Sequence, residues 1–297
     1  MPAIEVIINS GSGSVLAGET ERSLRQRFIA HGVKANVHLA ETGGEIVRLA
    51  AKAADGEAEI IVAGGGDGTI SAIANEVFRA GKILGVLPLG TLNNFSKDLG
   101  IPQDLGGAIK IIAKGDAEKV DLAEVNGRIF INNSSIGLYP QMVRQREEQQ
   151  RLGYGKWRAA FWSWLRIFRI SPFLKVAITL DGKQFQRKTP FVFVGNNEYE
   201  MDFYNIGRRP KLNEGKLSLY FLHREGRWGV TVLVFRTVFQ RLRQWRDFEA
   251  VSTEEITINT RKKRILVAFD GEIAVMESPL RYRTLPNALS VIVPEKR

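Results

Sequence analysis

The sequence predicts two domains, an open α/β domain followed by a mostly antiparallel β domain. Up to about residue 120, short apolar runs alternate with amphipathic stretches that end at glycine. This alternation is typical of βαβ units around a parallel sheet. Beyond that point, strand-like runs are joined by Asn126-Gly127 and Asp181-Gly182, which are strong hairpin signals. We therefore expect domains at residues 1–123 and 124–297 of the 297-residue chain.

In the first domain, strands and helices are expected in strict alternation. The predicted strands are Ala3–Ser10, Lys34–Glu41, Ala58–Ala63 and Ile83–Leu89. The predicted helices are Thr20–His31, Glu45–Ala54 and Thr69–Ala80, and a glycine follows each of them closely, as at many helix ends.

In the second domain, two hairpins and several further strands are expected. The hairpins span Glu124–Asn133 and Leu174–Gln186. The further strands are Phe191–Gly195, Lys216–Leu222, Glu255–Asn259, Ile265–Phe269 and Leu289–Val293. Two basic and aromatic stretches, around Lys156–Phe168 and Trp228–Trp245, are predicted to be helical.

Composition excludes several classes of function. The chain has no cysteine, and its three histidines, His31, His38 and His223, are not paired at metal-ligand spacing. No apolar run approaches the roughly 18 residues that a membrane-spanning helix needs. The first residues lack the pattern of a signal peptide, so we expect a cytoplasmic protein. The net charge of +10 favours a negatively charged partner.

The strongest local pattern is a glycine-rich segment between a strand and a helix. Ile60–Ala63 is followed by Gly64-Gly65-Gly66-Asp67-Gly68-Thr69 and then by a helical apolar pattern. Glycines let backbone N–H groups approach phosphate oxygens, and the start of a helix favours an anion. A tight strand-to-helix turn is the alternative interpretation. The sequence has no G-x-x-x-x-G-K-S/T motif, and this segment lacks the third glycine of G-x-G-x-x-G.

Two further polar turns are expected at the same edge of the sheet. Pro88-Leu89-Gly90-Thr91-Leu92-Asn93-Asn94-Phe95 follows one strand, and Asn9-Ser10-Gly11-Ser12-Gly13 follows the first. Taken alone, Thr91, Asn93 and Asn94 suit the capping of a short helix. Because parallel strands deliver such turns to one edge, where open α/β sheets bind ligands, they can also serve a common site.

Together these motifs resemble the catalytic domain of diacylglycerol kinases, sphingosine kinases and related bacterial lipid kinases. The segments that match, in order along nearly the whole chain, are Gly65–Thr69, Pro88–Phe95, Asp121-Leu122, Asn132–Gly137, Gly195–Asn197, Asn213–Leu217 and Asp270-Gly271-Glu272. The resemblance implies a Rossmann-like open parallel sheet, as in NAD kinases and diacylglycerol kinases, followed by an antiparallel β-sandwich that receives the lipid. It also implies an active site between the two domains.

The resemblance further implies an ATP-dependent, Mg²⁺-dependent transfer of the γ-phosphoryl group to a lipid hydroxyl. Asp67 and Glu272 take the catalytic positions, with Glu272 accepting the hydroxyl proton. The nucleotide-binding positions are Asn9, Gly65, Gly66, Asp67, Gly68, Thr69, Gly90, Thr91, Asn93 and Asn94. Asp67 and Asp121 are the implied metal ligands.

The chain departs from the family pattern at several positions. Asn94 stands where the family has an aspartate, Ser10 replaces a proline, and Glu214 replaces an aspartate. Ser14-Val15-Leu16 offers no counterpart to a lysine common in bacterial relatives. Two alternatives therefore stay open: an NAD kinase-like enzyme, and a catalytically weak nucleotide-binding or membrane-binding regulator with the same fold.

Two basic and aromatic stretches indicate which binding partners to expect. Between Lys156 and Arg169, aromatic residues recur at helical spacing beside arginines, which suits a helix on anionic lipid or one packed on its own domain. A second stretch carries Arg236, Arg241, Arg243 and Arg246. We expect a lipid substrate, peripheral contact with the anionic inner face of the membrane and no specific nucleic acid. A homodimer is left open.

Overall fold

The computed structural model describes residues 3–12, 19–137, 140, 173–202, 205–222 and 248–295. These residues form two compact units. The first comprises Met1–Leu122, Arg208–Gly215 and Leu285–Arg297, and the second comprises Ala123–Gly207 and Lys216–Thr284. Two segments from the second half of the sequence thus belong to the first unit.

The first unit contains a parallel sheet, as predicted. Its strands are β1 (Ile4–Asn9), β2 (Ala35–Ala40), β3 (Ile60–Gly65) and β4 (Ile83–Pro88), in the order β2-β1-β3-β4. Val6, Ile7 and Ile8 are all fully buried, which is typical of a strand covered on both faces.

The last strand of the chain completes this parallel sheet. Strand β18 (Leu280–Val293) begins in the second unit, and its final residues pair with β4 in parallel through Ser290 and Val291. The sequence predicts Leu289–Val293 as a strand of the antiparallel second domain, and the parallel pairing with β4 corrects this prediction. The run of apolar residues at 289–293 is buried, as in a parallel strand covered on both faces.

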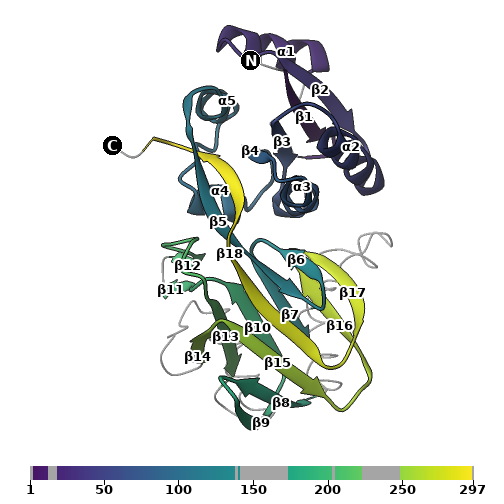
Figure 1. Cartoon of the computed structure of the whole chain (residues 1–297), viewed down its shortest axis with the longest axis vertical. Helices are drawn as coiled ribbons and strands as arrows, with labels where there is room; N and C mark the ends of the chain where they lie inside the picture. Colours follow the sequence, from purple (N-terminus) through teal and green to yellow (C-terminus); the bar gives the residue numbers. More distant parts are fainter. Residues whose placement is uncertain are drawn as a thin grey trace, which may run out of the picture. The chain divides into compact units, whose positions relative to one another are not determined.

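Helices flank both faces of the first sheet. They are α1 (Glu21–Ala30), α2 (Gly43–Asp55), α3 (Asp67–Arg79), α4 (Asn94–Asp98) and α5 (Leu105–Lys114). Helix α1 contacts α5 and α2 contacts α3, and Figure 1 shows the two pairs on opposite sides of the sheet. Helices α2 and α3 each begin two residues before the predicted start. Helix α5 was not predicted, because Gly106-Gly107 in its first turn is typical of a loop.

The second unit contains two large antiparallel sheets and a small two-stranded one. One has the order β14-β13-β10-β7-β16-β17, with β7 at Asn133–Gly137, β10 at Phe191–Asn196, β13 at Leu217–Leu222, β14 at Phe248–Thr253, β16 at Arg264–Phe269 and β17 at Glu272–Glu277. The other joins the first part of β18 to β15 (Glu255–Thr260), β8 (Leu174–Leu180) and β9 (Lys183–Thr189). The hairpin of β5 (Asp116–Val125) and β6 (Arg128–Phe130) pairs with β18, and β11 (Glu200–Asp202) pairs with β12 (Asn205–Arg208).

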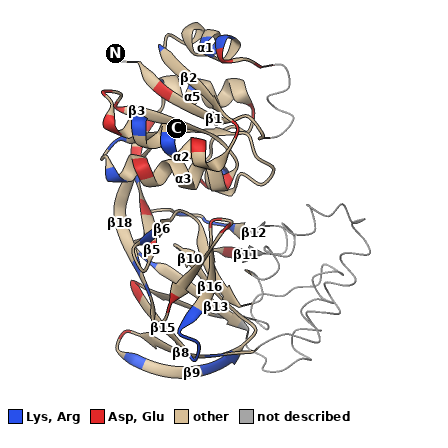
Figure 2. Cartoon of the chain, turned by 90° about the vertical axis from the view of Figure 1, so that its right-hand side faces the viewer, with Lys and Arg blue, Asp and Glu red and all other residues tan. Residues whose placement is uncertain are grey.

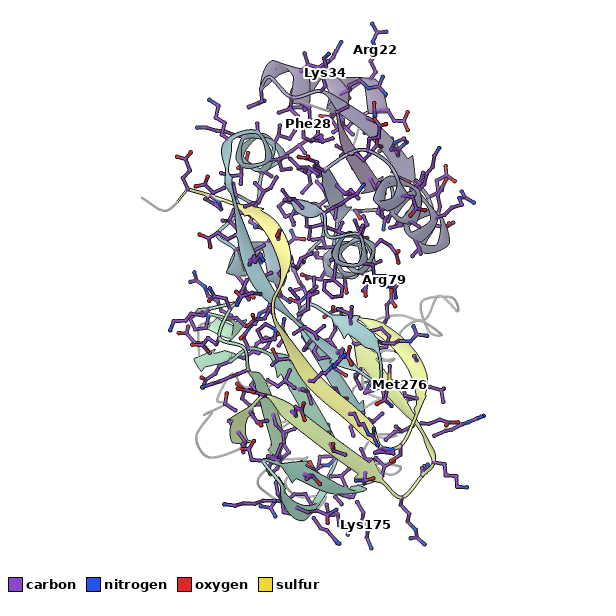
Figure 3. All side chains as sticks on the ribbon, viewed as in Figure 1. Arg22, Phe28, Lys34, Arg79, Lys175 and Met276 are labelled. Atoms are coloured by element: carbon purple, nitrogen blue, oxygen red, sulfur yellow. The ribbon has the colours of Figure 1, made fainter. Side chains whose placement is uncertain are left out.

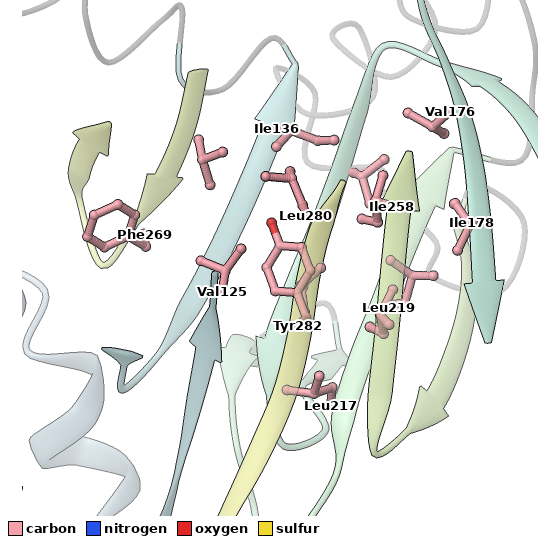
Figure 4. Packing of buried hydrophobic residues seen from close by; sticks show 14 of the residues in the cluster. Val125, Ile136, Val176, Ile178, Leu217, Leu219, Ile258, Phe269, Leu280 and Tyr282 are labelled. Atoms are coloured by element: carbon pink, nitrogen blue, oxygen red, sulfur yellow. The ribbon is translucent and has the colours of Figure 1, made fainter. Parts of the chain in front are cut away.

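The two antiparallel sheets bury their inner faces against each other, which confirms the predicted sandwich. Figure 4 shows Val176, Ile178 and Ile258 from one sheet packed with Ile136 and Leu219 from the other. All of these side chains are buried. Burial of each such side chain stabilises the fold by about 1.5–3 kcal/mol.

Three two-residue turns in this unit have the backbone conformation of tight hairpins. Asn126-Gly127 has φ angles of 48° and 80°, and Asp181-Gly182 has 48° and 76°. Both predicted hairpins are therefore confirmed. Asp270-Gly271, with φ angles of 46° and 88°, joins β16 to β17 in the same way. Its glycine supplies the left-handed conformation that other residues adopt at a cost.

Some sequence predictions fall on residues that the structure does not describe. These are the two basic and aromatic stretches, around Lys156–Phe168 and Trp228–Trp245, together with Ser14-Val15-Leu16 and His223. Among the residues that the structure does describe, the helices are too short or too polar to cross a membrane.

Candidate functional site

Most of the glycine-rich segment of the first unit belongs to a strand and a helix, so the loop between them is shorter than the sequence indicates. Gly64 and Gly65 are the last residues of β3, Gly66 is the N-cap of α3, and Asp67 is the first residue of that helix. The first N–H groups of a helix have no partner within it, and Gly66 has no side chain to cap them. The helix start can therefore bind an anion.

Glycine is required here by close packing. A Cβ atom on Gly64 would lie 2.7 Å from Ile8 Cγ1, and one on Gly65 would lie 2.6 Å from Thr69 Cβ. A Cβ atom on Gly90 would lie 2.4 Å from the Cα of Gly66. The backbones after β3 and β4 thus approach each other so closely that a side chain at position 90 has no room.

Asp67 joins the two turns. Its Oδ2 accepts the backbone N–H of Asn94 at 3.1 Å, and its Oδ1 accepts that of Phe95 at 3.0 Å. Asn94 and Phe95 are the first residues of α4, so the carboxylate caps this short helix from another element. The sequence suggested capping within the 88–95 segment, but the cap comes from Asp67.

Asn93 closes the turn that precedes α4. Its Oδ1 accepts the Gly90 N–H at 2.9 Å, and its Nδ2 donates to the Gly90 carbonyl oxygen at 2.9 Å. The residue is buried and has a left-handed φ of 51°. Thr91 and Asn94 are exposed beside it. Asn93 therefore shapes the turn, whereas Thr91 and Asn94 present their side chains to solvent.

Asn9 brings the end of β1 to the same edge. Its Nδ2 donates to Thr69 Oγ1 at 3.2 Å, and its Oδ1 accepts the Gly11 N–H at 3.0 Å. The structure thus brings together predicted site residues from the ends of β1, β3 and β4. This edge is where open α/β sheets bind their ligands.

Asp121, by contrast, has a structural role within the first unit. Its Oδ2 accepts the N–H of Gly215 at 2.6 Å, and its Oδ1 accepts that of Asn287 at 2.8 Å. The residue is buried. Its carboxylate therefore fixes both late segments of this unit. No cluster of three or more acidic or histidine side chains suited to a metal occurs among the described residues.

Asp270 of the second unit has a comparable role. Its Oδ2 accepts the N–H of Ile131 at 2.7 Å, and its Oδ1 accepts those of Asn132 and Asn133 at 2.8 and 3.1 Å. This buried carboxylate fixes the hairpin turn that presents Glu272, an exposed residue at the start of β17. The Asp-Gly-Glu motif thus forms the turn of the hairpin between β16 and β17, and Glu272 is exposed to solvent.

Comparison with known proteins shows which proteins the chain resembles. Residues 3–125 match the family model described as the diacylglycerol kinase catalytic domain. This part of the chain is therefore similar to diacylglycerol kinase catalytic domains. The chain is 27% identical over 305 residues to a diacylglycerol kinase of Bacillus subtilis, with 100% of this chain and 98% of that protein covered. It is also 27% identical over 224 residues to a diacylglycerol kinase of Staphylococcus aureus, with 74% and 70% covered.

Solved structures show the diacylglycerol kinase fold over the whole chain. A putative diacylglycerol kinase from Bacillus anthracis superposes with a TM-score of 0.74 at 24% identity, covering 98% of this chain and 95% of that one. A second structure of a diacylglycerol kinase from the same organism gives 0.70 at 21% identity, covering 98% and 96%. The predicted two-part fold class is therefore confirmed.

Residues 3–125 are connected to a later segment by an ion pair that the sequence did not predict. Arg209 Nε donates to Asp98 Oδ2 at 2.8 Å, the Arg209 backbone N–H donates to Asp98 Oδ1 at 3.2 Å, and both side chains are buried. Burial raises the pKa of Asp98 above its usual value, although the neighbouring Arg209 acts to lower it. The partners are 111 residues apart in sequence, and no periodic pattern links them.

Proposed function

We propose that this protein is an ATP:lipid phosphotransferase that transfers the γ-phosphoryl group to a hydroxyl of diacylglycerol or a related lipid. One observation carries the proposal. The carboxylate of Asp67 is fixed at a junction of two glycine turns, beside the helix start of α3. Phosphoryl transfer depends on holding the phosphates and a cation in position rather than on covalent chemistry by the protein. In this proposal, the junction holds both the phosphates and the cation.

The nucleotide phosphates would bind at the ends of β1, β3 and β4. Backbone N–H groups at the start of α3, from Gly66 to Thr69, would contact phosphate oxygens, and the exposed Thr91 and Asn94 would contribute side chains. Asn9 would hold Thr69 in place through their hydrogen bond. Asn93 and Gly90 would act by shaping the turn, because the amide of Asn93 bonds to both backbone groups of Gly90.

The residues at this junction fit a magnesium ion bound together with ATP. Each oxygen of Asp67 accepts one N–H group from α4, and a carboxylate oxygen has a second lone pair for a cation. Mg²⁺ in such sites takes one or two carboxylates together with substrate phosphates and water. When bound, the ion would neutralise charge on the phosphates. We assign Asp67 as its protein ligand, because Asp67 is partly exposed whereas Asp121 is buried.

Glu272 would act as the general base. Its carboxylate would accept the proton of the lipid hydroxyl while the hydroxyl oxygen forms a bond to the γ-phosphorus and the bond to ADP breaks. The hairpin turn fixed by Asp270 would hold the backbone before Glu272 in one conformation. A base of this kind contributes roughly a hundredfold to ten-thousandfold to a rate.

A lipid panel with labelled ATP and Mg²⁺ tests the proposal. We expect a phosphorylated lipid from the wild type and its loss in Asp67→Ala and Glu272→Ala. Glu277→Ala is the matched control, because Glu277 is another exposed glutamate on β17 and should leave activity unchanged. Equal labelling in the wild type and both active-site variants would overturn these assignments. If both residues serve one reaction, the double variant should lose little more than either single variant.

The same assay, with NAD added to the panel and ATP binding measured beside it, distinguishes two other functions. An NAD kinase-like enzyme would phosphorylate NAD and no lipid. A nucleotide-binding regulator, suggested by Asn94 in place of an acidic residue, would bind ATP without transfer to any hydroxyl. The match to the diacylglycerol kinase catalytic domain favours the lipid reaction. We place this reaction in the cytoplasm at the inner face of the membrane, where the lipid acceptor lies.

A further inference from the structure

A row of cations crosses one end of three adjacent strands in the second unit. Lys175 of β8 lies directly opposite Lys188 of β9. On the other side of β8, Val176 pairs with Thr260, so Arg261 follows next to the Lys175 position. Lys175, Lys188 and Arg261 are exposed. Figure 2 shows Lys and Arg along β9, and in Figure 3 the side chain of Lys175 points away from the ribbon.

A run of four cations extends this row. Arg261-Lys262-Lys263 joins β15 to β16, Arg264 is the first residue of β16, and all four residues are exposed. Arg264 pairs with Glu277 across the next hairpin, at 3.5 Å between exposed side chains. Like charges placed directly opposite each other, as Lys175 and Lys188 are, destabilise a sheet. This repulsion disappears when an anionic surface neutralises the lysines.

Two hollows flank this end of the sheet. They have volumes of about 380 and 440 Å³ and share Lys175, Thr260 and Arg261. The cations around them are Lys175, Arg187, Lys188, Arg261, Lys262 and Arg264, with no carboxylate among the described lining residues. The first hollow also has apolar walls from Phe173, Leu174, Ile265 and Leu266. Cationic rims around apolar walls suit an amphiphile with a negative head group.

We propose that this end of the sheet, formed by Lys175, Lys188 and Arg261–Arg264, binds the anionic phospholipid head groups of a membrane surface. Anionic membranes attract clustered Lys and Arg side chains, and the attraction adds up over the cluster. Single-stranded nucleic acid is the less suitable partner, because its bases require exposed aromatic platforms. In the described part of this surface, the ring of Phe173 is half-buried beneath Lys188, whose Nζ lies 5.6 Å from the ring centre.

This surface differs from the two basic stretches suggested by the sequence, and its binding does not require the kinase reaction. Vesicle sedimentation with the full chain tests it. Phosphatidylcholine vesicles with about 30% phosphatidylglycerol should bind the protein at low salt, vesicles of phosphatidylcholine alone should not, and rising salt should weaken binding. Asp67→Ala should bind like the wild type, so loss of kinase activity and loss of membrane binding can be told apart.

The decisive comparison uses two triple variants of equal net charge. The test variant is Lys175→Gln, Arg261→Gln and Lys262→Gln, and the control is Arg22→Gln, Arg25→Gln and Lys34→Gln, which removes exposed cations of the first unit. The test variant should bind on the order of a hundredfold more weakly than the wild type, since each cation near the surface contributes about fivefold. The control should stay close to the wild type.

Three outcomes would overturn the proposal. Equal losses in the two triple variants would mean that net charge alone drives binding. Absence of wild-type binding to anionic vesicles at low salt would exclude a membrane partner. Tighter binding to single-stranded RNA than to vesicles, lost in the test variant alone, would assign the surface to nucleic acid instead. Melting temperatures of both variants at least as high as that of the wild type would show that each protein is folded.

Discussion

Asp67 Oδ1 accepts the backbone N–H of Phe95 at 3.0 Å, which connects the first turn of α3 to the first turn of α4. A carboxylate at a helix start satisfies N–H groups that lack a partner and interacts favourably with the helix dipole. Asp67 therefore has a structural role whether or not a nucleotide is bound. Any experiment on Asp67 has to separate this role from the proposed one in catalysis.

Variants of Asp67 are expected to differ in stability and in activity. Asp67→Ala removes the acceptor of both α4 N–H groups and should lower the free energy of unfolding by about 1–2 kcal/mol. Asp67→Asn keeps one oxygen acceptor, so its free energy of unfolding should fall by less than that of Asp67→Ala. If Asp67 binds the metal, both variants should lose kinase activity to a similar extent, because an amide cannot supply the charge. Urea unfolding and the lipid assay measure the two effects, and full activity in Asp67→Asn would contradict the metal role.

Gly90 is expected to tolerate no side chain. In Gly90→Ala the new Cβ would lie 2.4 Å from Gly66 Cα and 2.8 Å from Asn93 Oδ1, so the two turns must separate. We expect a loss of at least about 1–3 kcal/mol in unfolding free energy, together with weaker ATP binding.

Gly44→Ala provides the matched control. A Cβ at Gly44 would meet no atom within 4 Å, and the residue is exposed in helix α2. Alanine is a better helix former than glycine by about 1 kcal/mol, so this variant should be neutral or slightly more stable. Equal behaviour of the two variants in urea unfolding and ATP titration would show that the contact between Gly66 and Gly90 is unimportant.

Much of the first unit could be predicted from sequence because its signals are local. The apolar runs of β1, β3 and β4 and the glycines after them fix both the element types and the edge where the turns meet. The hairpins at Asn126-Gly127 and Asp181-Gly182 were equally predictable, since only a few residue pairs adopt two successive left-handed conformations. Element ends were less exact. Helix α3 begins at Asp67 rather than Thr69, because Gly66 can serve as the N-cap.

The missing parts of the prediction depend on contacts between distant residues. The return of β18 to pair with β4 follows from no local pattern, since a run such as 289–293 is compatible with either kind of sheet. The structural roles of Asp121 and Asp270 could not be predicted from the sequence either. Their partners are backbone N–H groups of other segments, such as Gly215 and Ile131, and a sequence carries no sign of backbone donors.

Asp270 is expected to stabilise the second unit more than other residues in equivalent turns. Asp270→Ala leaves the N–H groups of Ile131, Asn132 and Asn133 without this acceptor, and each bond to a charged group contributes about 1.5–3 kcal/mol. Asp181→Ala is the control, since Asp181 has the same turn position with φ of 48° and accepts one side-chain hydrogen bond, from Thr253. Both variants carry the same backbone strain.

The difference between these two variants therefore compares the three backbone hydrogen bonds of Asp270 with the one side-chain hydrogen bond of Asp181. We expect Asp270→Ala to unfold at a clearly lower urea concentration than Asp181→Ala. Hydrogen exchange at residues 131–133 should be faster in Asp270→Ala alone. If the variants unfold at the same urea concentration and exchange equally at these amides, the carboxylate contributes no more than an ordinary turn residue.

The buried pair of Asp98 and Arg209 leads to a prediction with a defined pH dependence. Arg209→Met leaves a buried carboxylate without its cation, which should lower the free energy of unfolding by about 3–5 kcal/mol near pH 8. The pKa of Asp98 is already raised by burial, and Arg209 is the main group that lowers it, so the variant should raise this pKa further. The folded protein then binds a proton that the unfolded chain, with an ordinary aspartate pKa, has released.

Stability that depends on such a proton is present at low pH and is lost as the pH rises through the folded-state pKa. The loss of unfolding free energy in Arg209→Met, relative to the wild type, should thus be smaller near pH 5 than near pH 8 when measured by urea unfolding. The double variant Asp98→Leu with Arg209→Met removes the carboxylate as well, so it should regain most of the loss and show no such change with pH. A deficit equal at both pH values, or a double variant as unstable as Arg209→Met, would mean that the packing of Arg209, rather than its charge, holds α4 to the later segment.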